Sequence, residues 1–178
     1  MKMKNKIKSL DDIWWKSINL SPFEVRKVAN NTKTNFIFRE RYGKTSPKRR
    51  FWKNDYVFIR ELWHPDFFSN GHYIYESDNS YPYVSWNPPQ QMPRQAAKVF
   101  IKIIRIDRKR IQDLRIDEIR KSGFDDREQF ALDWDTIRWR KTDKWESNPM
   151  VGIYKFRRIN IKKYGDGPIV KPRYAEEE

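Results

Sequence analysis

Three segments rich in β-branched and aromatic residues most constrain how this chain can fold. Residues 56–63 read YVFIRELW, residues 98–107 read KVFIKIIRID, and residues 150–159 read MVGIYKFRRI. Such residues favour extended strands, whose successive side chains point to opposite faces of a sheet. Turn-forming residues surround two shorter strand candidates near Tyr75 and Val84. The pattern predicts a mostly β domain of the α+β class, with short helices flanking a curved sheet.

The clearest helix signal begins at Ser21. This serine precedes proline and stands three residues before Glu24, which is the spacing of a capping box, so we predict a helix over residues 22–29. Asn30 and Asn31 should end it, because asparagine tolerates the left-handed backbone. The alternation that follows, from Phe36 onward, predicts a strand.

Two further helices are predicted in the second half of the chain. The first spans residues 117–122 and ends at Gly123. The second spans residues 127–138 and is capped by Asp125 or Asp126, with aromatic residues at helical spacing.

The 178 residues suit one domain, which we place at residues 21–160. Residues 1–20 then form a basic amino-terminal arm or a short helix capped by Ser9, and residues 161–178 form a tail. No stretch approaches the roughly 20 apolar residues of a membrane-spanning helix, which leads us to expect a protein of the cytoplasm without membrane contact.

Residue usage also limits the available chemistry. The chain has no cysteine, which excludes disulfides, thiolate zinc sites and cysteine nucleophiles. Its two histidines, His64 and His72, are separated by a turn-rich stretch, so we predict neither a metal site nor a cofactor.

The charge is strongly basic. The chain carries 38 Lys and Arg against 24 Asp and Glu, a net charge of +14, and residues 1–60 alone carry 16 basic and 5 acidic side chains. Such an excess attracts polyanions, of which nucleic acid is the commonest in cells. Aromatic residues make up 16% of the chain, and those that alternate with Arg and Lys can offer stacking faces beside phosphate-binding charges.

Several short motifs follow one another in a characteristic order: Lys33-Thr34, FIRELW at 58–63, MPRQA at 92–96, Leu114, and NPMV at 148–151. No motif is specific by itself, but their order and spacing resemble the ASCH domain of the PUA-like superfamily, in particular the ASCH-like proteins of bacteriophages and prophages. The resemblance implies a β-barrel with a cleft that binds RNA or a nucleotide, and RNA is therefore favoured over DNA as partner.

Some members of that family are enzymes. In the group that deacetylates acetylcytidine, the resemblance implies a lysine, a threonine three residues later as nucleophile and a glutamate as proton carrier. Here Lys33 matches, but Phe36 replaces the threonine and Ser122 replaces the glutamate. Asn31 replaces the glycine of the motif. The loss of the attacking hydroxyl argues against this hydrolysis.

We expect ten residues to contact nucleic acid. They are Lys33, Thr34, Asn35, Arg39, Arg41, Arg60, Trp63, Trp86, Arg94 and Lys98. Structural alternatives exist for these residues: a tryptophan on a strand is more often a core residue than a stacking face. Arg60 and Glu61 are neighbours on a strand and point to opposite faces, so the one that faces the interior needs a charge partner, and a structural buried pair is the alternative to a ligand contact.

Two other functions remain open. One is a ribonuclease or deacylase acting on nucleotides, in which Lys33 is base or electrostatic stabiliser and Glu61 carries the proton. The other is a phage protein-interaction factor that contacts its partner through the aromatic-rich residues 73–86.

Overall fold

The computed structural model describes residues 13–42, 47–48, 50–66, 72–78, 83–137 and 140–160. The chain forms two compact units. The first unit comprises residues 1–26, 56–101 and 158–178, and the second comprises residues 27–55 and 102–157. Each unit is built from segments that are not contiguous in the sequence, so no single boundary along the chain separates the two units.

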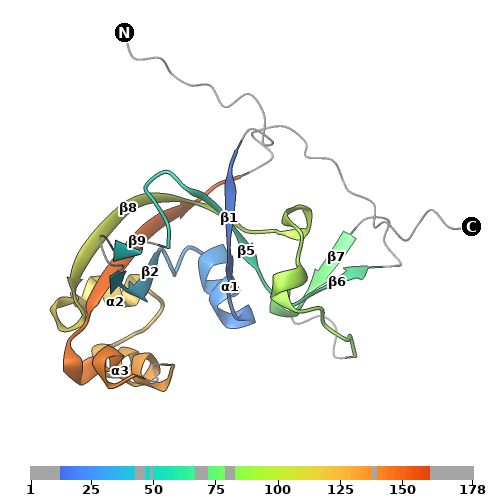
Figure 1. Cartoon of the computed structure of the whole chain (residues 1–178). Helices are drawn as coiled ribbons and strands as arrows, with labels where there is room; N and C mark the ends of the chain where they lie inside the picture. The colour runs from blue at the N-terminus through green and yellow to red at the C-terminus, as the bar shows by residue number, and fades with distance from the viewer. Residues whose placement is uncertain are drawn as a thin grey trace, which may run out of the picture. The chain divides into compact units, whose positions relative to one another are not determined.

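The helices and strands are short, apart from two long strands near the end of the chain. The strands are β1 (Trp15–Asn19), β2 (Asn35–Arg39), β3 (Arg41–Tyr42), β4 (Pro47–Lys48), β5 (Tyr56–Arg60), β6 (Trp63–Asp66), β7 (His72–Tyr75), β8 (Phe100–Arg110) and β9 (Met150–Arg158). The α-helices are α1 (Pro22–Ala29), α2 (Ile116–Lys121) and α3 (Arg127–Thr136), and single turns of 3-10 helix occur between β7 and β8, before α2 and after α3 (Figure 1).

Five strands form one sheet in the order β1-β5-β8-β9-β2. Strand β1 runs parallel to β5, with Trp15 opposite Tyr56, and β2 runs antiparallel to β9, with Asn35 opposite Lys155. Two-stranded pairs β3-β4 and β6-β7 complete the described strands. Among these strands the sheet is open, with β1 and β2 at its edges, so the α+β class is confirmed while closure into a barrel stays a prediction.

In the first unit, apolar side chains of β5 and of the segment before β8 pack together. Buried Phe58, Met92, Ala97 and Phe100 form this cluster, and Trp15 packs against it from β1. The Trp15 ring stands edge-on to Phe100 with 5.3 Å between centroids. This burial of large rings holds β1 on the sheet.

In the second unit, α2 and α3 cover an apolar cluster that also includes residues of β9. Its buried members are Ile111, Leu114, Ile119, Phe130, Trp134, Val151 and Ile153. A separate group of aromatic side chains packs between β2 and β9. The ring centroids of Phe36 and Phe156 lie 4.5 Å apart, and the ring of Phe38 contacts that of Tyr154. Figure 1 shows β8 and β9 as long curved strands beside each other.

The three predicted helices are present, although α2 starts and ends one residue earlier than predicted and α3 ends at Thr136 and not at residue 138. Helix α1 has the expected bounds, and its capping box is present, because the Glu24 N–H donates to Ser21 Oγ and the Ser21 N–H donates to a Glu24 oxygen, both at 3.3 Å. Asn31 follows with φ of 59°, in the left-handed region. Helix α3 is capped by Asp126, whose carboxylate accepts the N–H of Gln129 at 2.7 Å.

The strand after residue 56 is shorter than predicted. Strand β5 ends at Arg60, because the N–H of Glu61 points to the sulfur of Met92 at 3.4 Å instead of a neighbouring strand. The prediction of one strand over residues 56–63 is therefore wrong, and Trp63 begins β6.

Three other predictions differ from the structure. Strand β8 starts at Phe100 and not near Ala97, whose N–H closes a 3-10 turn to the carbonyl of Arg94. No strand forms at residues 83–86, where Tyr83 is 98% exposed and has no core to pack on. Trp15 lies in β1 and not in a helix capped by Ser9, because β1 pairs with β5 and the partly buried Trp15 ring packs against Phe100; Ser9 itself is outside the described residues.

Within the part of the chain that the structure describes, no helix is long and apolar enough to cross a membrane.

Candidate nucleic-acid interface

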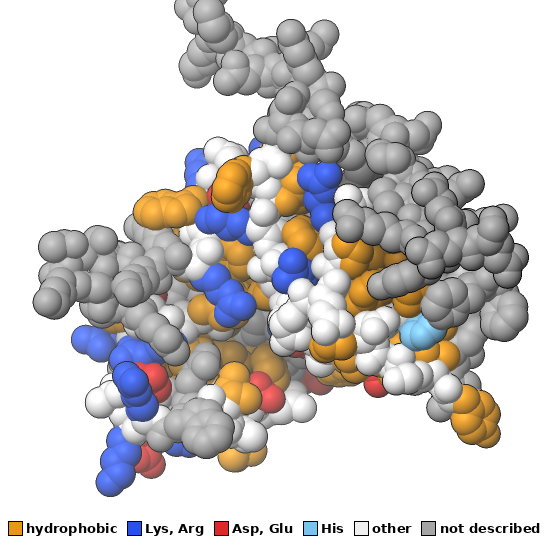
Figure 2. Space-filling model, turned by 45° about the vertical axis from the view of Figure 1, so that its right-hand side comes forward, with side chains coloured by type: hydrophobic (Ala, Val, Ile, Leu, Met, Phe, Trp, Pro, Cys, Tyr) orange, Lys and Arg blue, Asp and Glu red, His pale blue; other side chains and the backbone are white. Residues whose placement is uncertain are grey.

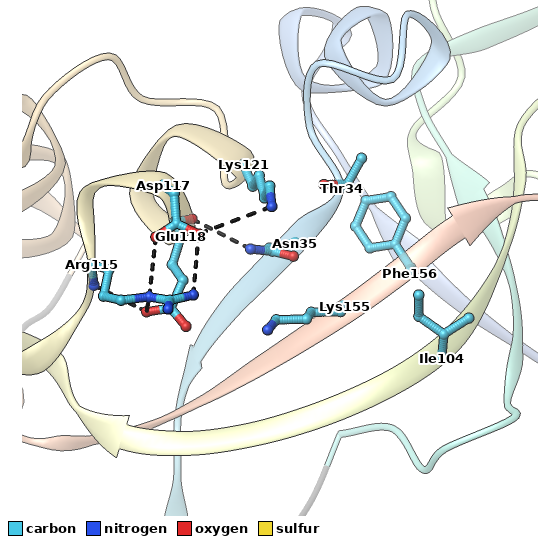
Figure 3. A pocket seen from close by; sticks show the side chains of 9 residues that line it. All are labelled: Thr34, Asn35, Ile104, Arg115, Asp117, Glu118, Lys121, Lys155 and Phe156. Atoms are coloured by element: carbon cyan, nitrogen blue, oxygen red, sulfur yellow. Dashed lines mark hydrogen bonds and ion pairs between the residues drawn. The ribbon is translucent and has the colours of Figure 1, made fainter.

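A pocket of about 200 Å³ lies in the second unit, where the start of β2 meets α2 (Figure 3). Strands β8 and β9 supply its other sides. It is lined by Thr34, Asn35, Ile104, Arg115, Asp117, Glu118, Lys121, Lys155 and Phe156. Two of the predicted contact residues, Thr34 and Asn35, therefore share one concave site.

The main chain fixes the position of Thr34 and Asn35. The Thr34 N–H donates to the carbonyl of Lys121 at 2.8 Å, and its own carbonyl accepts the N–H of Phe156 at 3.0 Å. The Asn35 side chain, in a residue that is 1% exposed, donates from its amide nitrogen to the carbonyl of Glu118 at 3.4 Å. The segment is thus held to both α2 and β9.

Glu118 is a buried carboxylate with several donors. Lys109 Nζ lies 2.9 Å and 3.0 Å from its two oxygens, and the Arg115 N–H donates to Oε2 at 3.0 Å. Burial alone would raise the pKa of Glu118, but these hydrogen bonds and the charges of Lys109 and Arg115 outweigh it, so the pKa is lowered. Glu118 is therefore ionised at neutral pH and a poor proton donor.

The basic side chains around the pocket are held by acidic neighbours to different degrees. Lys155 lies 2.8 Å from Asp107, which Arg105 also contacts at 2.6 Å. Burial raises the pKa of Asp107, but its bonds to Lys155 and Arg105 outweigh this and lower it. Lys121 is held least tightly, at 4.0 Å from Asp117 with 58% of its side chain exposed. Its ammonium can reorient toward an incoming anion.

Lys33 does not line this pocket. It is 7% exposed, and its ammonium lies 5.7 Å from the centroid of the Phe36 ring. A Cβ at Gly123, whose φ is +99°, would meet the Lys33 side chain at 3.7 Å, so the lysine lies beside the end of α2. There the Ser122 hydroxyl donates to the carbonyl of Ile119 at 2.7 Å. Phe36, three positions after Lys33, thus places an aromatic ring and no hydroxyl beside the Lys33 ammonium.

The other predicted contacts of the second unit have different surroundings. Arg39 pairs with Asp143 at 2.8 Å and is about a quarter exposed. Arg41 lies in β3 opposite Lys48, and its side chain is outside the described residues.

Five predicted contacts and Glu61 belong to the first unit. The guanidinium of Arg60 lies 5.0 Å from the Phe58 ring centroid and that of Arg94 5.7 Å from the Trp15 ring. Trp63 stands edge-on to Tyr73 at 5.6 Å, while Trp86 is half-buried outside any strand.

Glu61 and Lys98 are brought together within the first unit. Lys98 Nζ lies 3.6 Å from Glu61, donates to Ser77 Oγ at 2.6 Å and also contacts Asp78. Burial raises the pKa of Glu61, although hydrogen bonds from Ser77 and the charge of Lys98 lower it in part. Lys33 lies in the second unit and Glu61 in the first. Glu61 is thus a buried charge with a charge partner, which is the structural alternative predicted for it, and that partner is Lys98.

Sequence reasoning missed seven of the nine lining residues, among them Glu118, Lys121 and Lys155. The spacing of Arg115 and Glu118 gave a local signal for the helix start. The other two come to the pocket through strand register and the position of α2, for which the sequence gives no local sign. Among the described residues, no group of three or more His, Cys, Asp or Glu side chains could hold a metal ion.

No family model matches the chain, and no curated protein matches it. Among solved structures, the chain is similar to a mutant of the ZmASCH protein from Zymomonas mobilis, with 11% sequence identity and a TM-score of 0.40. The match covers 90% of this chain and 91% of that one. At this distance the likeness carries no statement about the site or activity of this chain.

Proposed function

We propose that this protein binds single-stranded nucleic acid, with RNA favoured over DNA, as an ASCH-like module of phage or prophage origin that acts in the host cytoplasm. The observation that carries the proposal is the distribution of charge between the two units. The second unit holds 24 basic and 13 acidic side chains, a net +11 of the total +14. The first unit accounts for the remaining +3.

The same unit contains the pocket, with Arg115, Lys121 and Lys155 around it. Figure 2 shows Lys and Arg side chains recurring over the face in view, with apolar side chains between them. Positive charge beside small concave and apolar surfaces suits a strand that has phosphates along one side and bases on the other.

The test is equilibrium binding of a fluorescent single-stranded RNA dodecamer, measured by anisotropy between low and moderate salt. Each phosphate contact should contribute about −0.7 to the slope of log affinity against log salt. We expect a slope of roughly −2 to −3.5, corresponding to about three to five such contacts. Undetectable binding to RNA and DNA at low salt would refute the proposal.

A pair of matched variants locates the interface. Lys121→Ala removes an exposed charge from α2 in the second unit, and Lys16→Ala removes the same charge from β1 in the first. Lys121→Ala should weaken binding by several-fold and make the salt slope shallower, while Lys16→Ala should change neither. The reverse result would place the interface in the first unit.

A further inference from the structure

We propose that the pocket beside α2 takes one adenine base of the bound strand and that Asn35 reads it. This inference rests on the proposed function, since it names the base that a nucleic-acid-binding protein would select. Three features of the site support it: the size of the pocket, the orientation of the Asn35 amide, and the separation of a base contact from a phosphate contact.

The size of the pocket limits what can enter it. Sites for drug-sized ligands measure about 300–1,000 Å³. A pocket of about 200 Å³ therefore takes one fragment of a nucleic acid, such as a single base, and not a stack of two. Its walls combine apolar Ile104, which is 42% exposed, with polar Asn35 and Thr34.

The hydrogen bond to α2 fixes the two ends of the Asn35 amide. The nitrogen is the end that can donate to the Glu118 carbonyl, and this assigns the oxygen to the opposite end. Figure 3 shows that oxygen pointing away from α2. An amide nitrogen carries two hydrogens, of which this bond uses one. Asn35 therefore retains an acceptor and one donor side by side.

This donor and acceptor pair matches adenine. The Asn35 oxygen accepts a hydrogen from the adenine N6 amino group while the remaining N–H donates to N7, a pairing that asparagine makes with adenine in known nucleic-acid complexes. Uracil and thymine present a carbonyl where adenine carries its amino group, so they would place oxygen against oxygen.

Lys121 supplies the contact that does not depend on sequence. It is more than half exposed, and its ion pair with Asp117 spans 4.0 Å, so its ammonium can turn to a phosphate next to the bound base. Lys155, opposite Asn35 on β9, is held by Asp107 at 2.8 Å. Base selection and general affinity are thus assigned to different side chains.

The experiment uses the full chain and uracil octamers of RNA that carry one changed base at the centre. Adenine at that position should bind about fivefold or more tightly than uracil. N6,N6-dimethyladenine, which cannot donate from N6, should lose this gain, and 7-deazaadenine should lose part of it. Because these octamers are tested on the unaltered protein, no folding defect can explain their result.

Two variants complete the test. Asn35→Leu keeps a similar side-chain volume and should bind adenine and uracil octamers equally, while Lys121→Ala should weaken both by the same factor. Equal binding of adenine and uracil octamers to the unaltered protein, or a preference that survives Asn35→Leu, overturns the inference and leaves the proposed function standing. Loss of binding to every octamer at low salt instead overturns the proposed function.

Discussion

Lys98 Nζ lies 3.6 Å from an oxygen of Glu61, a residue that is 1% exposed. The other oxygen, Oε2, has no hydrogen-bond partner among the described residues. An ionised carboxylate in such a place loses its hydration and depends on the nearby ammonium for compensation. The pair is therefore a point where stability should depend on pH.

Removing this ammonium should destabilise the protein more at neutral than at acidic pH. The folded pKa of Glu61 is raised above the ordinary value of 4.5, so its stabilising contribution is complete below 4.5 and is lost as pH rises through the folded value. Lys98→Met should enlarge this loss, lowering the free energy of unfolding by about 1–3 kcal/mol at pH 7 and by less at pH 4.5. Urea unfolding at both pH values measures it. In a Glu61→Gln background the pH dependence of the effect should disappear, and its persistence would contradict the assignment.

Glu118 should behave in the opposite way. Its folded pKa is lowered, so its contribution is present above the ordinary value of 4.5 and is lost as pH falls through the folded value. Glu118→Gln should cost about 1–3 kcal/mol at pH 7, because Lys109 and the start of α2 lose a charged acceptor. A double-mutant cycle with Lys109→Met should give a coupling of about 0.5–3 kcal/mol. Strict additivity would show that the two residues do not act as a pair.

Gly152 should resist any side chain. A Cβ there would lie 2.8 Å from the ring of Tyr154, which is buried and packs edge-on against Phe51. Gly152→Ala should destabilise the protein by about 1–3 kcal/mol in thermal or urea unfolding, because the aromatic group must move. Tyr154→Leu is the control, since it removes the clashing ring. In that background the added cost of alanine should fall, and an unchanged cost would place the strain in the backbone.

Asn31 offers a conformational test with a matched pair of variants. Its φ of 59° lies in the left-handed region that glycine adopts freely and alanine does not. Asn31→Ala should lower the free energy of unfolding by about 1–2 kcal/mol, while Asn31→Gly should change it by a few tenths. Equal effects of the two variants would mean that the asparagine side chain, and not its backbone, matters.

Catalysis through Lys33 predicts a different outcome from binding alone. The centroid of the Phe36 ring lies 5.7 Å from the Lys33 ammonium, at the position where the resemblance to the acetylcytidine-deacetylating group would require a threonine hydroxyl. We expect no product when the protein is incubated with labelled RNA or acylated nucleosides and analysed by chromatography. Turnover that Lys33→Ala abolishes would instead support the enzyme hypothesis.

Several features could be read from sequence because short-range contacts create them. Ser21 and Glu24 cap α1 three residues apart, Asp126 caps α3 through Gln129, and Asn31 ends α1 by its own backbone preference. Each depends only on residues within one helical turn of each other, so the local sequence contains all the side chains that form it.

The strand ends were harder to predict, because tertiary contacts decide them. Residues 56–63 have one continuous β-forming composition, yet the strand stops at Arg60, where Glu61 turns toward Met92. Trp15 follows a helix-capping pattern but lies in a strand, since its ring gains more from burial against Phe100 than a weak cap supplies.

The sequence by itself determined the α+β class, the three helices and the positive net charge, which follows from composition and does not depend on the fold. Only the tertiary structure decided that Asn35 lies opposite Lys155 and donates a hydrogen bond to the carbonyl of Glu118, and that Lys98 forms an ion pair with Glu61. The reason is physical. Charge and local propensity are carried by each residue, whereas a pocket forms where segments as far apart as residues 35 and 118 meet through strand register and core packing.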